Sequence, residues 1–376
     1  MFDSYPKIPI NEEAFSGMTF RVRYPKILTD VIQSELFDQR ITQELENLKQ
    51  SLNTQLVDRL SNTTAAYWHD FYVEYEGKKL IDLPFFDAEV YLFALINSIV
   101  QYDTLQIDPY SKIKSADLSQ SQLAFDRILA SSKDWDTKDF ILNNLHGNKS
   151  DLSQLVHGDE VAIEVILDDS QTLIGQLPRY TSTEIILDNT GMELFSDLLL
   201  VDHLIDKYDH QITLHIKAAP LFVSDVIDED ITKLLDFLSH HQEEFVQRIK
   251  TYIKQGKITI VAHNFWNSPG HFDTIPKDLI SKESLLLSKG DANYRRFFGD
   301  RILDSATNAF ELTSYLKNEA FAIRTLKSDI QTSLSTELVQ SLNSRNKEWR
   351  NIGKFAVIQK VSARILKIPN SSQKES

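Results

Sequence analysis

The feature that most constrains the fold of this chain is a change of pattern near Thr183, where short apolar runs begin to alternate with helical segments. Each run is continuously apolar and is followed by polar residues, which is typical of strands buried on both faces of a sheet. Alternation of such strands with helices predicts an α/β fold, with an α/β/α core around a mostly parallel sheet. The runs are TEIILD (183–188), ITLHIKA (212–218), KITIVAH (257–263), ESLLLSK (283–289) and FAIRTLKSD (321–329).

The part of the chain before these runs has a helical pattern. Residues 27–62 contain no Gly or Pro, and their apolar residues recur at helical spacing, which predicts one or two amphipathic helices. Residues 85–101 are richer in large apolar side chains, so we expect a buried helix there. The chain is therefore predicted to comprise a helical N-terminal region (1–160), an α/β/α core (161–368) and a polar tail (369–376).

The composition argues against several classes of partner. The chain has 40 basic and 54 acidic residues, a net charge of −14, so we expect no binding to nucleic acid or to an anionic membrane. It contains no cysteine, which excludes disulfides, thiolate metal sites and a thiolate nucleophile. We also see no secretory signal and no apolar stretch near the roughly 20 residues of a membrane-spanning helix. These features favour a cytoplasmic protein and leave its oligomeric state open.

Polar side chains gather where each predicted strand ends. In an open parallel sheet, ligands bind beyond the carboxyl ends of the strands, so these residues are candidates for a site. The same residue types are also typical of turns and helix caps, an alternative that each motif alone leaves open. Four of the chain's 11 glycines fall in these loops, where the backbone turns sharply or approaches a ligand. Those glycines are Gly191, Gly270, Gly290 and Gly299.

The residue types at these strand ends suit one kind of chemistry. Asp188, Asn189 and Asp225 offer hard oxygen donors of the kind that Mg²⁺ or Mn²⁺ prefers. His263 and His271 lack a spaced His or Cys partner, which argues against zinc. A divalent cation and several basic side chains around one anion would stabilise the charge that develops in phosphoryl transfer. The basic candidates are Lys289, Arg295 and Lys327.

Four motifs occur in the order LDNTGMELFSDL (187–198), FVSDV (222–226), SKGDANYRR (288–296) and RTLK (324–327). As an ordered set they resemble the damage-control phosphatase family, also called the domain-of-unknown-function-89 family. The Arg-Thr-x-Lys motif is similar to that of its sugar-phosphate phosphatase branch (subfamily III), which includes the acidic residue methyltransferase-like proteins. The segment PFFDAEVYLF (84–93) resembles the N-terminal helical motif of that branch, so the likeness spans about 84 to 327.

This resemblance implies a metal-dependent phosphoric monoester hydrolase that acts on small phosphorylated sugars such as fructose 1-phosphate or fructose 6-phosphate. It implies that Asp188, Asn189 and Asp225 bind a divalent cation, which would be Mn²⁺, Mg²⁺, Co²⁺ or Ni²⁺. It also implies that Lys327 contacts the phosphorylated substrate. We expect catalytic roles for Asp188, Asp225, Asp291 and Lys327, with Asp225 or Asp291 as the base. The substrate-binding set that the resemblance implies is Asp188, Asn189, Glu193, Lys289, Gly290, Asp291, Asn293, Tyr294, Arg295, Arg324 and Lys327.

Two other functions stay open at this point. One is an S-adenosylmethionine-dependent protein-glutamate carboxyl methyltransferase, an activity attributed to some relatives of the family. That activity calls for a Gly-rich loop after the first strand, where only Gly191 occurs. The other is a catalytically silent metabolite-binding protein, which calls for a broken motif, and no motif is broken. Whether water or a carboxylate attacks phosphorus is also left open by the sequence.

Overall fold

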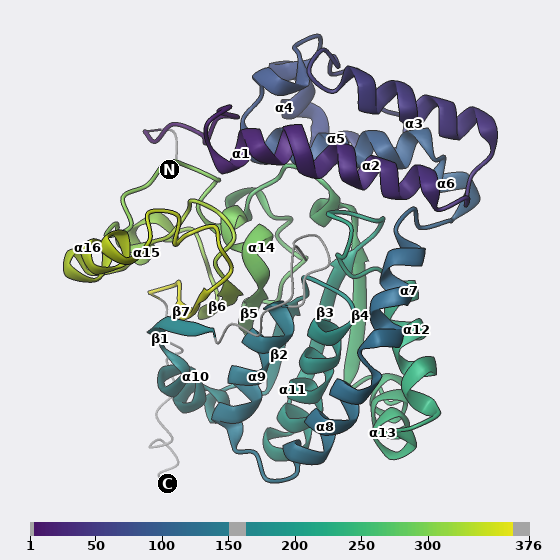
Figure 1. The fold of residues 1–376 in the computed structure, drawn as a ribbon. Coiled ribbons are helices and arrows are strands. Elements are labelled where there is room, and N and C mark those ends of the chain that lie inside the picture. Colours follow the sequence, from purple (N-terminus) through teal and green to yellow (C-terminus); the bar gives the residue numbers. More distant parts are fainter. Residues whose placement is uncertain (1–3, 150–162, 364–376) are drawn as a thin grey trace, which may run out of the picture.

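A single twisted sheet organises the computed structural model, which describes residues 4–149 and 163–363 (Figure 1). The strand order within these residues is β1-β7-β6-β5-β2-β3-β4, and β2 to β6 run parallel to one another. All five predicted strands are present, which confirms the expected α/β fold with a mostly parallel sheet. They are β2 (Ser182–Ile186), β3 (Gln211–Lys217), β4 (Ile258–His263), β5 (Leu285–Lys289) and β6 (Ala320–Thr325).

Two further strands, β1 (Glu164–Asp168) and β7 (Phe355–Lys360), were not predicted from the sequence. Strand β7 pairs antiparallel with β6 and parallel with β1, so both run against the rest of the sheet. The edge strand β1 is only partly buried, and its two end residues carry charges, which hides the pattern of a buried strand.

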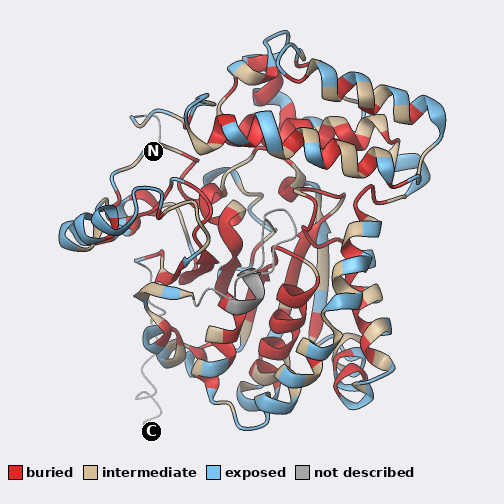
Figure 2. Cartoon of the chain, viewed as in Figure 1, coloured by how far each residue is buried: buried red, intermediate tan, exposed pale blue. Residues whose placement is uncertain are grey.

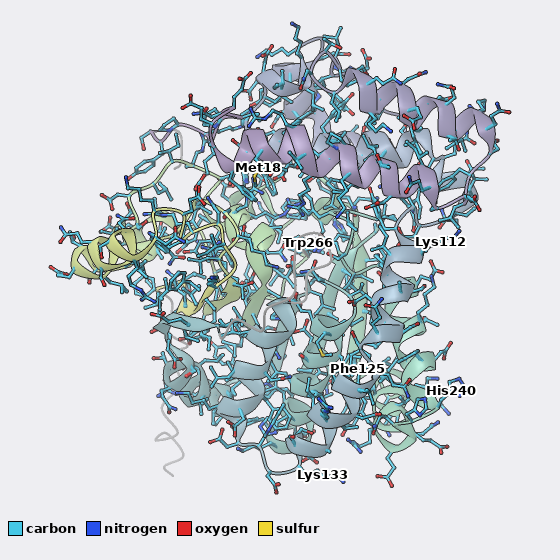
Figure 3. The ribbon with its side chains drawn as sticks, viewed as in Figure 1. Met18, Lys112, Phe125, Lys133, His240 and Trp266 are labelled. Carbon is cyan, nitrogen blue, oxygen red and sulfur yellow. The ribbon has the colours of Figure 1, made fainter. Side chains whose placement is uncertain are left out.

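Helices cover both faces of the sheet. On one face, Phe125 and Phe195 lie with their ring centroids 4.7 Å apart inside the largest apolar core, and Figure 3 labels Phe125 there. Trp266 belongs to another apolar core, which is formed by α14, α15 and the loop after β4. The described helices after residue 110 are α7 (Ser111–Gln120), α8 (Gln122–Ser132), α9 (Thr137–Lys149), α10 (Ser170–Gln176), α11 (Met192–Tyr208), α12 (Asp228–Ser239), α13 (Glu243–Lys254), α14 (Gly290–Phe297), α15 (Ala309–Leu312) and α16 (Thr336–Arg345).

Residues 4–110 form a separate layer of helices, which we call the helical cap. Its apolar cluster also takes in Leu221 and Val223 from the loop after β3, so the cap lies over the carboxyl ends of the parallel strands (Figure 1). Its central helix α5 is largely buried, as expected (Figure 2). The cap helices are α1 (Phe15–Met18), which continues through a π-helical turn (Thr19–Arg23) into α2 (Tyr24–Gln33), then α3 (Gln39–Ser51), α4 (Ala65–Tyr75), α5 (Phe85–Ile99) and α6 (Tyr102–Leu105).

The helical pattern predicted over 27–62 holds only as far as Ser51, where α3 ends. Beyond it, Leu56 forms a β-bridge with Lys79, and the backbone N–H of Val57 donates to the carbonyl of Lys78 over 2.9 Å. Pairing with a distant segment therefore overrides the local helical preference of residues 52–62.

Helices α8 and α9 lie in the chain before the first strand but contribute Phe125, Phe140, Ile141 and Leu145 to the core of the sheet. The predicted polar tail at 369–376 lies outside the described residues. Among the described helices, none combines the length and apolar character that crossing a bilayer requires.

Candidate active site

A cleft lies between the helical cap and the carboxyl ends of β2, β3, β5 and β6. Asp188 and Asn189 follow β2, and Asp225 stands in the loop after β3. Asp291 is the second residue of α14, which begins directly after β5, and Lys327 follows β6 by two residues. Parallel strands therefore bring together five of the residues predicted from the sequence. The lining of the cleft comprises Phe15, Arg23, Glu89, Asp188, Asn189, Phe222, Asp225, Asp291, Ala292, Arg295 and Lys327.

The loops that carry the predicted metal ligands are tied to each other through their backbones. Asn189 and Asp225 form an isolated antiparallel β-bridge. The N–H of Val226 donates to the carbonyl of Asp188 over 2.9 Å. In the same loop, Phe222 and Val223 have φ angles of 49° and 74°, a left-handed conformation that such side chains rarely adopt. Strain of this kind beside a cleft is held in place by the surrounding packing and is typical of functional sites.

The side-chain amide of Asn189 has one fixed arrangement of hydrogen bonds. Its Nδ2 donates to Oδ2 of Asp188 and to Oε2 of Glu193, each over 2.9 Å. Its Oδ1 accepts from the hydroxyl of Ser224 over 2.6 Å. An amide oxygen has two lone pairs, so Oδ1 keeps the capacity to bind a second partner in the cleft.

Negative charge is concentrated at the floor of the cleft. Burial, then the nearby charges of Glu193 and Asp225, hold the pKa of Asp188 well above its usual range, while Lys217 and Lys327 oppose the shift. Lys217 Nζ lies 3.0 Å from Oδ2 of Asp225. A bound cation would relieve the repulsion between the carboxylates, so these donors fit a divalent cation.

The donor set differs from a purely acidic metal centre. No group of three or more His, Cys, Asp or Glu side chains with the placement of a metal site occurs in the described parts of the chain. The predicted set comprises two carboxylates and one amide, Asp188, Asp225 and Asn189. Hard cations accept amide oxygens and water alongside carboxylates, so this mixture remains suited to such an ion.

The absence of a side chain at Gly290 leaves room for the carboxylate of Asp188. The φ angle of Gly290 is 77°, and a β-carbon built there would lie 1.8 Å from Oδ2 of Asp188. Both the left-handed backbone and the close approach therefore require glycine at this position.

Lys289 lies behind the cleft and does not line it. Its ammonium is completely buried and lies 3.0 Å from Oε1 of Glu193 and 2.7 Å from Oδ1 of Asp197. Burial alone lowers the pKa of Lys289, but these two carboxylates outweigh that effect and raise it above its usual value. The sequence predicts that Lys289 contacts the substrate, but its side chain is directed away from the cleft. It pairs with Glu193, which in turn accepts a hydrogen bond from Asn189.

Arg324 is likewise buried behind the cleft. Its guanidinium donates to Oδ1 of Asp291 and lies with its central carbon 3.5 Å from the ring centroid of Tyr294. The backbone N–H of Lys327 also donates to Oδ1 of Asp291, over 3.2 Å. Arg324 and Tyr294 therefore support Asp291 and do not line the cleft, and Asn293 is turned toward the carbonyls of Leu187 and Lys289.

Arg295, which is predicted from the sequence, also lines the cleft. It donates to Glu89 over 2.5 Å and to Asp300 over 2.7 Å, and Tyr24 donates to the other oxygen of Glu89. The sequence analysis missed Glu89 and Arg23. Glu89 lies within the 84–93 motif, which was a usable signal. Arg23 stands in no recognisable motif.

The fold and cleft define an α/β protein with a site of oxygen donors and cations beneath a helical cap. A sequence model described as the damage-control phosphatase ARMT1-like domain matches residues 19–342, and the chain belongs to this family. This confirms the family that the ordered motifs indicated.

Relatives align over most of the chain. It is 25% identical over 428 aligned positions to damage-control phosphatase ARMT1 of Mus musculus, with 93% of this chain and 96% of that protein covered. Identity to the Homo sapiens protein of the same name is 26%, with 92% and 96% covered. A solved structure of a DUF89 family protein from Pyrococcus horikoshii superposes with a TM-score of 0.53 at 14% identity, covering 91% of this chain and 97% of that one. That last likeness concerns the fold alone.

Proposed function

We propose that this chain is a metal-dependent phosphatase that hydrolyses phosphorylated sugars such as fructose 1-phosphate or fructose 6-phosphate. The observation that carries the proposal is the meeting of Asp188, Asn189 and Asp225 with Lys327 in one cleft. Oxygen donors for a cation beside a basic side chain suit a phosphate ester, whose charge must be balanced in the transition state. The relatives named damage-control phosphatase support the same class of reaction.

Asp188, Asn189 and Asp225 would hold the divalent cation, for which Mn²⁺, Mg²⁺, Co²⁺ and Ni²⁺ are the candidates. Such a cation supplies positive charge that stabilises the phosphoryl oxygens. The chain prepares this site in advance, because Glu193 and Ser224 fix the amide of Asn189 and Lys217 fixes Asp225.

Lys327 would offset the charge of the phosphoryl oxygens from the side of β6. Both predicted bases, Asp225 and Asp291, line the cleft. Asp291 is the better candidate, because Asp225 is assigned to the cation. Its Oδ1 is held by Arg324 and by the backbone of Lys327. In this proposal the oxygen of a water molecule forms a bond to phosphorus, and the bond to the sugar oxygen breaks. Asp291 accepts a proton from the attacking water, and this proton is then transferred to the sugar oxygen.

Release of inorganic phosphate from a panel of sugar phosphates tests the proposal. The wild-type chain, stripped with EDTA, should be inactive and should regain turnover when one of the four cations is added. Asp225→Asn should lose turnover and metal binding by calorimetry, while Asp236→Asn, at an exposed aspartate, serves as the matched control.

Full turnover after exhaustive EDTA treatment would refute the metal dependence. Tight, stoichiometric binding of S-adenosylmethionine with no phosphate release from any sugar phosphate would replace the proposal by the methyltransferase.

A further inference from the structure

Arg23 is a cation at the cleft with unused hydrogen-bonding capacity. It is the last residue of the π-helical turn Thr19–Arg23 and lines the cleft from the side of the cap. Its Nε is buried and has no hydrogen-bond partner among the described residues. Single π-helical turns inside α-helices occur frequently at functional sites. Arg23 is therefore a candidate for ligand binding that the sequence motifs did not identify.

The other arginine of the cleft, Arg295, is already committed. It pairs with Asp300 and Glu89, and its guanidinium carbon lies 4.8 Å from the ring centroids of both Phe85 and Phe86. These contacts use its donors to fix Glu89 in the wall of the cleft. Arg295 is thus a positioning residue, and Arg23 beside it still has donors to offer a ligand.

Glu89 supplies the complementary acceptor. Tyr24 binds one of its carboxylate oxygens and Arg295 binds the other, so the side chain is held in a single orientation. Burial and then the charge of Glu89 raise the pKa of Tyr24, and the charge of Arg23 opposes this shift, so Arg23 lies near the network. A fixed carboxylate and a guanidinium that line the same cleft suit hydroxyl groups, since each hydroxyl both donates and accepts a hydrogen bond. A second phosphate would instead be repelled by Glu89.

Arg23 and Glu89 lie on the opposite side of the cleft from the proposed metal ligands, so the two groups can bind opposite ends of a substrate. Asp188, Asn189 and Asp225 come from the sheet side of the cleft, where the phosphoryl group would bind, whereas Arg23 and Glu89 come from the cap. A phosphosugar held by its phosphate at the sheet extends its hydroxyl-bearing part toward the cap. We propose that Arg23 and Glu89 form a polyol-binding subsite, with Arg23 as the residue that determines specificity for the sugar part of the substrate. This inference rests on the proposed phosphatase function.

The test compares a sugar phosphate with a phosphate ester that has no polyol. Arg23→Gln should lower kcat/KM for fructose 1-phosphate by about 10- to 100-fold, the range for hydrogen bonds made by a charged donor, mainly through KM. The same variant should leave kcat/KM for p-nitrophenyl phosphate unchanged. Arg23→Lys, which keeps the charge, should recover part of the loss. Arg21→Gln, at an exposed arginine of the same turn, is the matched control and should behave as wild type.

Calorimetry in EDTA gives a second readout that does not depend on turnover. Arg23→Gln should weaken binding of fructose 1-phosphate and leave binding of inorganic phosphate as in wild type. Equal losses on both esters, or no loss on either, would overturn the polyol subsite while leaving the phosphatase proposal intact. If wild type releases phosphate from neither ester with any of the four cations, the proposed function fails, and this inference fails with it.

Discussion

A β-carbon on Gly290 would stand 1.8 Å from Oδ2 of Asp188, so the first residue of α14 leaves room only for the carboxylate that follows β2. Gly290→Ala should therefore displace Asp188 and abolish both metal binding and phosphate release. Gly256→Ala is the matched control, because Gly256 also has a positive φ of 72° but nothing within 4 Å of the added carbon. That control should cost about 1–2 kcal/mol of stability through backbone strain and retain activity. Wild-type metal affinity in Gly290→Ala, measured by calorimetry, would contradict the crowding.

Lys289 neutralises two buried carboxylates, Glu193 and Asp197. Lys289→Met should lower the free energy of unfolding by about 3–5 kcal/mol, because it leaves buried charges without their partner. Urea denaturation measures the loss, with Lys250→Met at an exposed ion pair as control. The control should change stability by about 0–1 kcal/mol. If Lys289→Met is as stable as wild type and shows only a raised KM, Lys289 binds the substrate and does not stabilise the fold.

Lys327 lines the cleft, and its charge acts on Asp188. Lys327→Met should lower kcat/KM for sugar phosphates by about 10²- to 10³-fold, the range for a lost contact to transition-state charge. Lys347→Met, at an exposed lysine, is the control in the same phosphate-release assay. Unchanged kcat/KM in Lys327→Met would show that the side chain does not act on the phosphoryl group.

His271 should make the fold sensitive to acid. Burial, and then the positive charges of Arg296, Lys7, Arg301 and Arg295, lower the pKa of His271 to about 3. An unfolded histidine titrates near 6.5, so below about pH 6.5 the unfolded chain binds a proton that the folded chain rejects. This part of the stability is complete above pH 6.5 and falls as the pH drops toward 3.

Thermal unfolding between pH 7 and pH 5 checks this linkage. Tm should fall less steeply with pH in His271→Gln than in wild type, whereas His240→Gln, at an exposed histidine, should follow wild type (Figure 3). Parallel Tm curves for His271→Gln and wild type would contradict the assignment.

The parallel strands and the residues at their ends could be predicted because both depend on local pattern. A short apolar run marks a buried strand, and the polar residues after it must lie at one edge of a parallel sheet. This logic brings Asp188, Asp225 and Lys327 to one cleft without knowledge of any contact.

The contributions of the cap and the direction of individual side chains could not be predicted in this way. Whether Lys289 points into the cleft or away from it depends on Glu193 and Asp197 in α11, a helix far from it in the sequence. Arg23 reaches the cleft only because the cap packs over the sheet, which no spacing of residues within the cap reveals.

The place of β7 between β6 and β1 has a consequence for the order in which the fold can be completed. Strand β1 is at the edge of the sheet, and β7 is its one neighbour there among the described strands. During synthesis β1 therefore leaves the ribosome long before Phe355–Lys360 exists to receive it. Pairing between such distant segments is slow, since the entropy cost of closing a long loop comes before any stabilising contact forms. Until then the edge of β6 is open to other strands, so a chain stalled before Phe355 would be prone to aggregate.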